Sequence, residues 1–264
     1  MQRCNPSSRS PSAISCLHAA STLAQDTTML TELQKLERMI RTHQQPAIVN
    51  MKEGFYKTIP VIFQNEHQHD VCDLFGGLMD SLSTPELPSQ KRRSASSSVQ
   101  SLTSTVFTGA TQETFRCTSC SFHEVKVPVD FRIVVLPVNG NQSGSPVPLK
   151  QLFIDFNSPG ALPNKTCSRC RSNNTTTSTT AFTTAPPSLM VQLIRFDHTM
   201  TKQFYPVSFP YDLDLPGIAA SYSLVAVTRH LSSPVGTQHG GHYVADVKEA
   251  DASWWRCDDE SVTP

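Results

Sequence analysis

The sequence predicts an α+β fold in which helices come first and strands follow. Before residue 83, apolar side chains recur at helical spacing, whereas from Phe107 onward short apolar runs alternate or form blocks typical of strands. Strands and helices do not alternate regularly, so a parallel sheet built from repeated strand–helix–strand units is not expected.

Two amphipathic helices are expected in the first part of the chain. The first spans Met29 to Arg41, with charged residues between its apolar positions. The second begins near Asp70, although Gly76 and Gly77 weaken it by roughly 1 kcal/mol each relative to alanine. Its apolar stripe consists of Val71, Leu74, Phe75, Leu78 and Leu82.

The rest of the chain is expected to be mostly strands. Alternating valines at 125, 127 and 129 are followed by Ile133 and Val135, while residues 189–196 and 222–228 read as buried strands. The polar, threonine-rich stretch 173–184 is expected to be an exposed hairpin or loop.

At 264 residues the chain could form one large domain or two smaller ones. Residues 1–25 are not assigned, and 26–264 are predicted to form one domain. Within it, 83–105 is expected to be a mobile Ser-rich insertion and 107–185 a β-rich region with cysteine pairs. The basic triplet at 91–93 is interpreted as part of a solvated loop.

Composition argues against some classes of protein. Lys+Arg and Asp+Glu are balanced at 22 each, so no basic field attracts nucleic acid or a membrane surface. No run of 18 apolar residues predicts a transmembrane helix, and no apolar N-terminal run predicts a secretory signal. We therefore expect a cytoplasmic or nuclear protein, in which cysteines act as metal ligands or nucleophiles more often than as disulfides.

Two CxxC pairs predict a structural zinc site. "CTSC" contains Cys117 and Cys120, and "CSRC" contains Cys167 and Cys170. Each spacing lets two sulfur atoms converge in one tight turn, and tetrahedral zinc takes four thiolates. A complete set of four leaves no open position for water, so the metal's role would be structural.

Near the C-terminus, "GGHY" and "CDDE" predict a base and the group that orients it. A hairpin would bring His242 and Asp258 together, so that the aspartate holds the imidazole in one tautomer. A Gly-Gly-His sequence taken alone fits a structural turn histidine better than a catalytic one. Cys257 is expected in the core.

Five segments in order resemble the ubiquitin-specific proteases, the papain-like cysteine deubiquitinases, over roughly residues 30–262. They are "QHDVCDLF", "FTGATQETFRCTSC" with the later "CSRC", "PPSLMVQLIRF", "GGHYVA" and "WWRCDDESV". The resemblance implies a helical thumb, a β-rich palm and zinc-stapled β fingers, with ubiquitin as partner and zinc as the cofactor.

The resemblance also implies roles for particular residues. His242 is the expected general base, Asp258 the third member of the triad, and Asp259 an assisting acid. Asp70 and Asp73 would grip the arginines of the C-terminal tail of ubiquitin, although Asp70 also suits a helix cap. Gly240, Gly241 and Tyr243 would line the channel for the terminal Gly-Gly of ubiquitin.

The sequence departs from the family at its nucleophile. The box Gly-Asn-Thr-Cys-Tyr is not found, and the candidates are Cys16, in "ISCLHAASTLA", and Cys4; Cys72 is expected to be a core or surface residue. The expectation is a protease domain shortened at both ends. Two hypotheses follow: a cysteine deubiquitinase that cuts after the terminal glycine of ubiquitin, and an inactive ubiquitin-binding scaffold.

Overall fold

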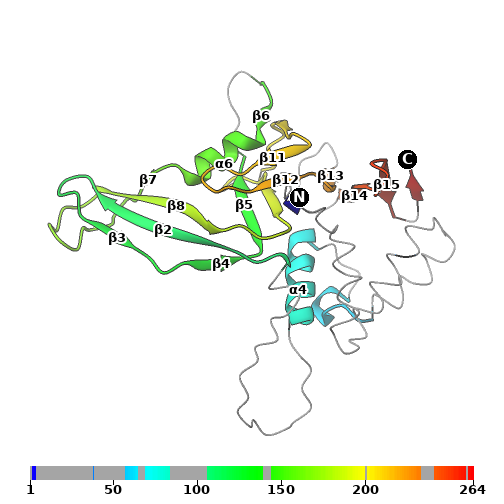
Figure 1. The fold of residues 1–264 in the computed structure, drawn as a ribbon, viewed down its shortest axis with the longest axis horizontal. Coiled ribbons are helices and arrows are strands. Elements are labelled where there is room, and N and C mark those ends of the chain that lie inside the picture. Colours follow the sequence, from blue (N-terminus) through cyan, green and yellow to red (C-terminus); the bar gives the residue numbers. More distant parts are fainter. Residues whose placement is uncertain are drawn as a thin grey trace, which may run out of the picture. The chain divides into compact units, whose positions relative to one another are not determined.

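The computed structural model describes residues 2–3, 38, 57–64, 69–83, 106–138, 144–199, 201–232, 241–259 and 261–264. The chain forms two compact units: one contains residues 6–107 and 224–264, and the other is mainly Thr108–Ser223. Described strands greatly outnumber helices and lie mostly after residue 107, which agrees with the predicted α+β class (Figure 1). No helix in these ranges is long and apolar enough to cross a membrane.

The first unit combines a helix with a small antiparallel sheet. Helix α4 (Val71–Ser83) confirms the helix predicted near Asp70, and the 3-10 turn η1 (Val61–Phe63) precedes it. A Cβ at Gly77 would lie 2.7 Å from the Phe63 ring, so this glycine gives the turn room to approach the helix. The helix predicted over 29–41 lies outside the described residues except Arg38, which is helical.

The sheet of this unit contains four strands in chain order. They are β13 (Ala226–Ser232), β14 (Gly241–Lys248), β15 (Trp254–Asp258) and β16 (Ser261–Thr263), all antiparallel to their neighbours.

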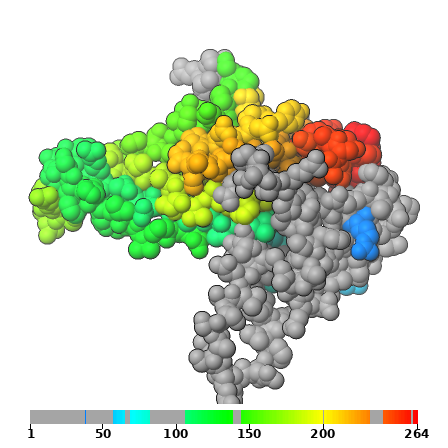
Figure 2. Space-filling model, in the orientation of Figure 1, coloured from blue at the N-terminus to red at the C-terminus, as the bar shows by residue number. Residues whose placement is uncertain are grey.

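The second unit contains a long β arm (Figure 1). Its centre is the antiparallel pair β2 (Gly109–Cys117) and β8 (Thr176–Thr184). Strands β3 (His123–Val125) and β4 (Val129–Phe131) both pair with β2, while β7 (Gly160–Ala161) pairs with β8. Figure 2 shows this arm, in green and yellow-green, as a slender projection of its unit.

Shorter elements form the rest of this unit. Two parallel pairs are present: β5 (Ile133–Pro137) with β9 (Met190–Ile194), and β6 (Val147–Pro148) with β10 (Val207–Ser208). Strand β12 (Ser221–Ser223) lies between β11 (Asp212–Asp214) and β1 (Gln2–Arg3). Helix α6 (Leu149–Asn157) buries Leu149, Leu152 and Phe153.

An aromatic cluster anchors the arm to this core. Phe182 of β8 lies between Phe131 of β4 and two rings of α6, Phe153 and Phe156, with ring centroids 5.4 to 6.2 Å apart. Aromatic pairs at this separation are favourable beyond the area that they bury. The core therefore fixes the root of the strands that carry the cysteine pairs at their other end.

The threonine-rich stretch was predicted wrongly as an exposed hairpin or loop. Residues 176–184 form strand β8, which pairs with β2 along its length. Threonine is β-branched and therefore favours strands, and the partner strand is some 60 residues away in sequence, where local polarity gives no sign of it.

Other strand predictions were right in type but wrong in extent. Residues 222–228 form two strands, β12 and β13, rather than one. The valines at 125, 127 and 129 belong to β3, the link and β4, and are 53%, 81% and 66% exposed, so their alternation marks no buried face. Helix α6 was missed, although its apolar residues at 149, 152, 153 and 156 follow helical spacing.

Candidate active site and metal centre

The hairpin of β14 and β15 carries a histidine–aspartate pair. Asp246 pairs with Arg256 across the two strands. Residues two apart on a strand share a face, so His242 and Asp258 project from the same face as this pair. His242 Nε2 lies 2.5 Å from Asp258 Oδ1, although the residues are sixteen apart in sequence.

Asp258 fixes the tautomer of the His242 imidazole and stabilises its protonated form. The hydrogen bond to Asp258 is the main cause that raises the pKa of His242 above its usual 6.5. Because Nε2 faces the carboxylate, Nδ1 is the ring nitrogen left to exchange a proton with another group. The two side chains are 41% and 46% exposed, so the pair is accessible from solvent.

Asp259 lies on the other side of the same ring. Its Oδ2 is 4.0 Å from His242 Nδ1, and its side chain is 70% exposed. Its φ of 48° lies in the left-handed region, which is uncommon for a residue other than glycine and directs consecutive carboxylates to opposite edges of one imidazole.

A second histidine packs behind the glycine before His242. A Cβ at Gly241 would lie 2.0 Å from Nε2 of His230, and the His230 ring stacks against Tyr243 with centroids 4.6 Å apart. The sequence explained this glycine by the approach of a substrate chain, whereas in the structure it gives room to the side chain of His230. Sequence reasoning missed His230, since only the register of β13 with β14 places it there.

Tyr243 connects the sheet to the start of α4. Burial first, and then the charge of Asp70, raise the pKa of its phenol, while a hydrogen bond from the backbone N–H of Val71 opposes them. Asp70 caps the helix: its Oδ1 accepts from the N–H of Cys72 at 2.7 Å. Asp70 and Asp73 are both exposed at this helix start.

Three charged side chains join the strands of the site. Asp246 of β14 accepts from Arg229 Nη2 at 2.6 Å and from Arg256 Nε at 3.0 Å, and so connects β13, β14 and β15. These strands carry His242 and Asp258, so the charged group stabilises their register.

The two cysteines of this unit that the structure describes are not suited to be nucleophiles. Burial is the main cause that raises the pKa of Cys72, to about 11, and Asp70 adds to it. Burial also raises the pKa of the half-buried Cys257. A nucleophilic cysteine needs a stabilised thiolate, and these surroundings disfavour one. Cys16, Cys4 and Gly240 lie outside the described residues.

In the other unit, the four cysteines of the CxxC pairs converge. Their sulfur atoms all lie within 4.8 Å of one another, and the closest contacts, Cys117 with Cys170 and Cys120 with Cys167, are both 3.7 Å. Four thiolates at this separation suit a tetrahedral zinc ion and leave no position for a substrate.

The two cysteine turns have the same backbone geometry. In each, the N–H of the first cysteine bonds to the carbonyl five residues on, from Cys117 to Phe122 and from Cys167 to Ser172. The residue after the second cysteine, Ser121 or Arg171, has a positive φ near 60°. Each turn therefore directs two sulfur atoms to one point.

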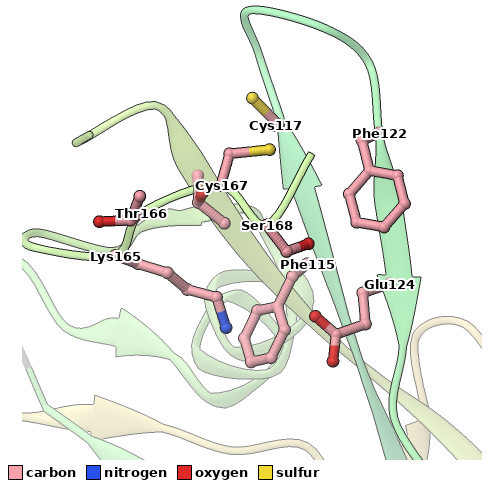
Figure 3. Close-up of a pocket in the computed structure, with 9 residues that line it drawn as sticks. Phe115, Cys117, Phe122, Glu124, Lys165, Thr166, Cys167 and Ser168 are labelled. Atoms are coloured by element: carbon pink, nitrogen blue, oxygen red, sulfur yellow. The ribbon is translucent and has the colours of Figure 1, made fainter. Parts of the chain in front are cut away.

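A cavity of about 250 Å³ lies beside this cluster (Figure 3). Lys165 Nζ lies 3.3 Å from the centre of the Phe115 ring, in a cation–π contact. The wall also contains Glu124 and the buried cysteines Cys117 and Cys167.

The chain thus carries a histidine–aspartate pair on a hairpin and four converging cysteines on a β arm. The sequence profile described as ubiquitin carboxyl-terminal hydrolase matches residues 3–264. The chain belongs to the ubiquitin carboxyl-terminal hydrolase family.

Similar proteins agree with this assignment. Ubiquitin carboxyl-terminal hydrolase 17-like protein B of Mus musculus is 36% identical over 105 residues, which are 37% of this chain and 22% of that protein. Ubiquitin carboxyl-terminal hydrolase 17 of Arabidopsis thaliana is 28% identical over 170 residues, 60% of this chain and 22% of that protein.

A solved structure shares the fold. The SAGA DUB module of Ubp8, Sgf11, Sus1 and Sgf73, bound to monoubiquitin, matches with a TM-score of 0.73 and 18% identity. The match covers 96% of this chain and 60% of that one. The present chain thus corresponds to about a fifth of the length of these two relatives and to part of the solved chain.

Proposed function

We propose that this chain is a thiol-dependent deubiquitinase, which hydrolyses the isopeptide or peptide bond after the C-terminal glycine of ubiquitin. The observation that carries the proposal is the 2.5 Å contact of His242 with Asp258 in a chain of this family. That contact supplies a base whose tautomer is fixed.

Each nitrogen of His242 has a separate task in the proposed reaction. Nε2–H donates to Asp258, and Nδ1 takes the proton of the nucleophilic thiol. The thiolate attacks the carbonyl carbon, the C–N bond breaks, and the imidazolium returns its proton to the leaving amine. Water then attacks the thioester, with Nδ1 again as base, and releases the carboxylate of ubiquitin.

Cys16 is the proposed nucleophile. Four of the six cysteines that the structure describes form the metal cluster, and the surroundings of the other two, Cys72 and Cys257, raise their pKa values. Cys4 has no flanking sequence that matches the family, whereas Cys16 lies in a segment with helical character.

Ubiquitin is the proposed partner, bound through its C-terminal tail. Asp70 and Asp73 present two exposed carboxylates at the start of α4, which suits the arginines of that tail. Tyr243 lies against this helix start and adjoins His242, so the acids and the base belong to one unit of the chain. Gly240 and Gly241 are proposed to line the path of the terminal glycines.

The cysteine cluster is proposed to hold the arm together with zinc and to take no part in the reaction. Its four sulfur atoms are free thiols rather than disulfides. Such pairs persist in reducing compartments, which supports a cytoplasmic or nuclear location.

The test uses ubiquitin with a thiol-reactive electrophile at its C-terminus, followed by peptide mapping of any adduct. An adduct on Cys16 or Cys4 that is lost in His242→Ala supports the proposal. Reversible binding of ubiquitin without an adduct, and without hydrolysis of a fluorogenic ubiquitin conjugate, refutes it. That outcome would favour the inactive ubiquitin-binding scaffold.

A further inference from the structure

Hydroxyl groups line one half of the cysteine cluster. Ser172 Oγ lies 2.7 Å from Cys170 Sγ, and Thr175 Oγ1 lies 3.5 Å from Cys117 Sγ. Thr175 Oγ1 is also 3.2 Å from Ser172 Oγ, so its one hydrogen can be donated either to Ser172 or to the thiolate of Cys117. The sulfur atoms of Cys120 and Cys167 lie 3.7 Å apart, and the sulfur of Cys120 accepts a hydrogen bond from the backbone N–H of Phe122 rather than from a hydroxyl. The four ligands therefore have unequal surroundings.

The position of Thr175 is fixed by the opposite cysteine turn. Its carbonyl accepts from the backbone N–H of Thr118 at 2.8 Å and from the Thr118 hydroxyl at 3.0 Å. Thr118 follows Cys117 directly, so these bonds hold the Thr175 hydroxyl beside the sulfur of Cys117. A donor that is held in place loses little entropy when it bonds to a thiolate.

The shortest hydroxyl contact belongs to the most exposed of the four cysteines. Cys170 is exposed, Cys120 is half-buried, and Cys117 and Cys167 are buried. A thiolate that accepts a hydrogen bond is a weaker nucleophile, because part of its electron density is engaged by the donor. Ser172 is therefore placed where an electrophile or oxidant could reach the cluster.

We propose that Ser172 and Thr175 are positioning residues for the zinc site, which donate to the thiolates of Cys170 and Cys117 and protect the exposed one from electrophiles. Four thiolates around Zn²⁺ leave a net charge of −2, and each donor stabilises the ionised ligand and fixes its direction. This role depends on zinc binding and not on peptidase activity, so the two proposals can fail independently.

Zinc release tests the proposal directly. The zinc-loaded chain and the variants Ser172→Ala and Thr175→Val would be mixed with a chromogenic chelator, and the release rate and competition affinity measured. Loss of either donor should weaken zinc binding by about 10-fold or more. The conservative variants Ser172→Thr and Thr175→Ser retain a hydroxyl and should stay close to the original chain.

Thr177→Val is the matched control. Thr177 lies two residues beyond Thr175, at the start of strand β8, but its hydroxyl donates to the backbone carbonyl of Arg116 at 3.3 Å rather than to sulfur. Zinc release unchanged in Ser172→Ala and Thr175→Val, or accelerated equally in Thr177→Val, would overturn the proposal.

Alkylation supplies a second readout. Brief treatment of the zinc-loaded chain with a maleimide, followed by peptide mapping, gives the ratio of labelling at Cys170 to labelling at Cys120. In Ser172→Ala this ratio should rise, because the exposed Cys170 has lost its hydroxyl donor. An unchanged ratio would refute the protective role.

Discussion

Asp70 combines a structural contact with a proposed binding contact, and two substitutions separate them. Its Oδ1 accepts from the N–H of Cys72 at 2.7 Å, while the carboxylate stays exposed at the start of α4. Asp70→Asn keeps an oxygen acceptor and removes the charge. Asp70→Ala removes both.

The expected magnitudes differ between the two variants. Loss of an N-cap acceptor lowers the free energy of unfolding by about 1 kcal/mol, whereas asparagine caps about as well as aspartate. Removal of the charge near the helix N-terminus costs roughly 0.3–1 kcal/mol, less at such an exposed position. An exposed carboxylate–arginine pair contributes roughly 0.2–1 kcal/mol to binding, which corresponds to about 1.4- to 5-fold in Kd.

We therefore expect Asp70→Ala to lose stability and ubiquitin affinity, and Asp70→Asn to lose mainly affinity. Urea unfolding measures the first quantity, and fluorescence anisotropy with labelled ubiquitin the second. Asp80→Asn, an exposed acid further along the same helix, is the control and should bind ubiquitin normally. Full affinity in Asp70→Asn would refute the tail contact at this position, and equal destabilisation of both variants would refute the cap.

The pKa of the Cys72 thiol provides a further test of the two Asp70 variants. Asp70 is the second cause, after burial, of the raised pKa of Cys72, which is about 11. Both substitutions should lower that pKa without returning it to its ordinary value of 9.0, because burial remains. The rate of thiol alkylation against pH measures it.

Three further predictions concern the remaining contacts. Asp258→Asn should reduce kcat/KM by roughly 10²–10⁴-fold in a ubiquitin hydrolysis assay and lower the pKa of His242. Because folding raises the pKa of His242, the stability difference between the chain and the variant should be greatest below about pH 6.5 and should decrease as pH rises through the folded pKa. Thermal unfolding at a series of pH values measures this difference. Tyr222→Phe should lower the free energy of unfolding in urea by about 1–3 kcal/mol, because it removes the buried hydrogen bond to the carbonyl of Pro186 at 2.7 Å. A decrease of less than about 0.5 kcal/mol would show that water replaces the hydroxyl. Chelation of the metal should lower the melting temperature and zinc should restore it, whereas a melting temperature unaffected by a chelator that removes all the metal would contradict a stabilising role.

Local spacing was a sufficient guide where one turn or one hairpin decides the geometry. The CxxC spacing placed two sulfur atoms in each turn, and the sixteen residues from His242 to Asp258 matched one hairpin. The helix at 71–83 followed from its apolar period even though it contains two glycines. The packing of Phe63 against Gly77 explains one of these glycines, which the sequence had treated as a weakness.

Pairing between distant segments decided the features that the sequence did not predict. The sequence of β8 is polar and predicts a loop, although the segment pairs with β2 as a strand. The same pairing brings the hydroxyl of Thr175 to the sulfur of Cys117, 58 residues away. His230 meets Gly241 for the same reason, since the register of β13 with β14 sets the contact. In each case the residue type permits the contact and the strand partner creates it. The side chains that tune the two sites are therefore found from strand register, whereas the metal ligands and the histidine–aspartate pair themselves are already visible in short segments of the sequence.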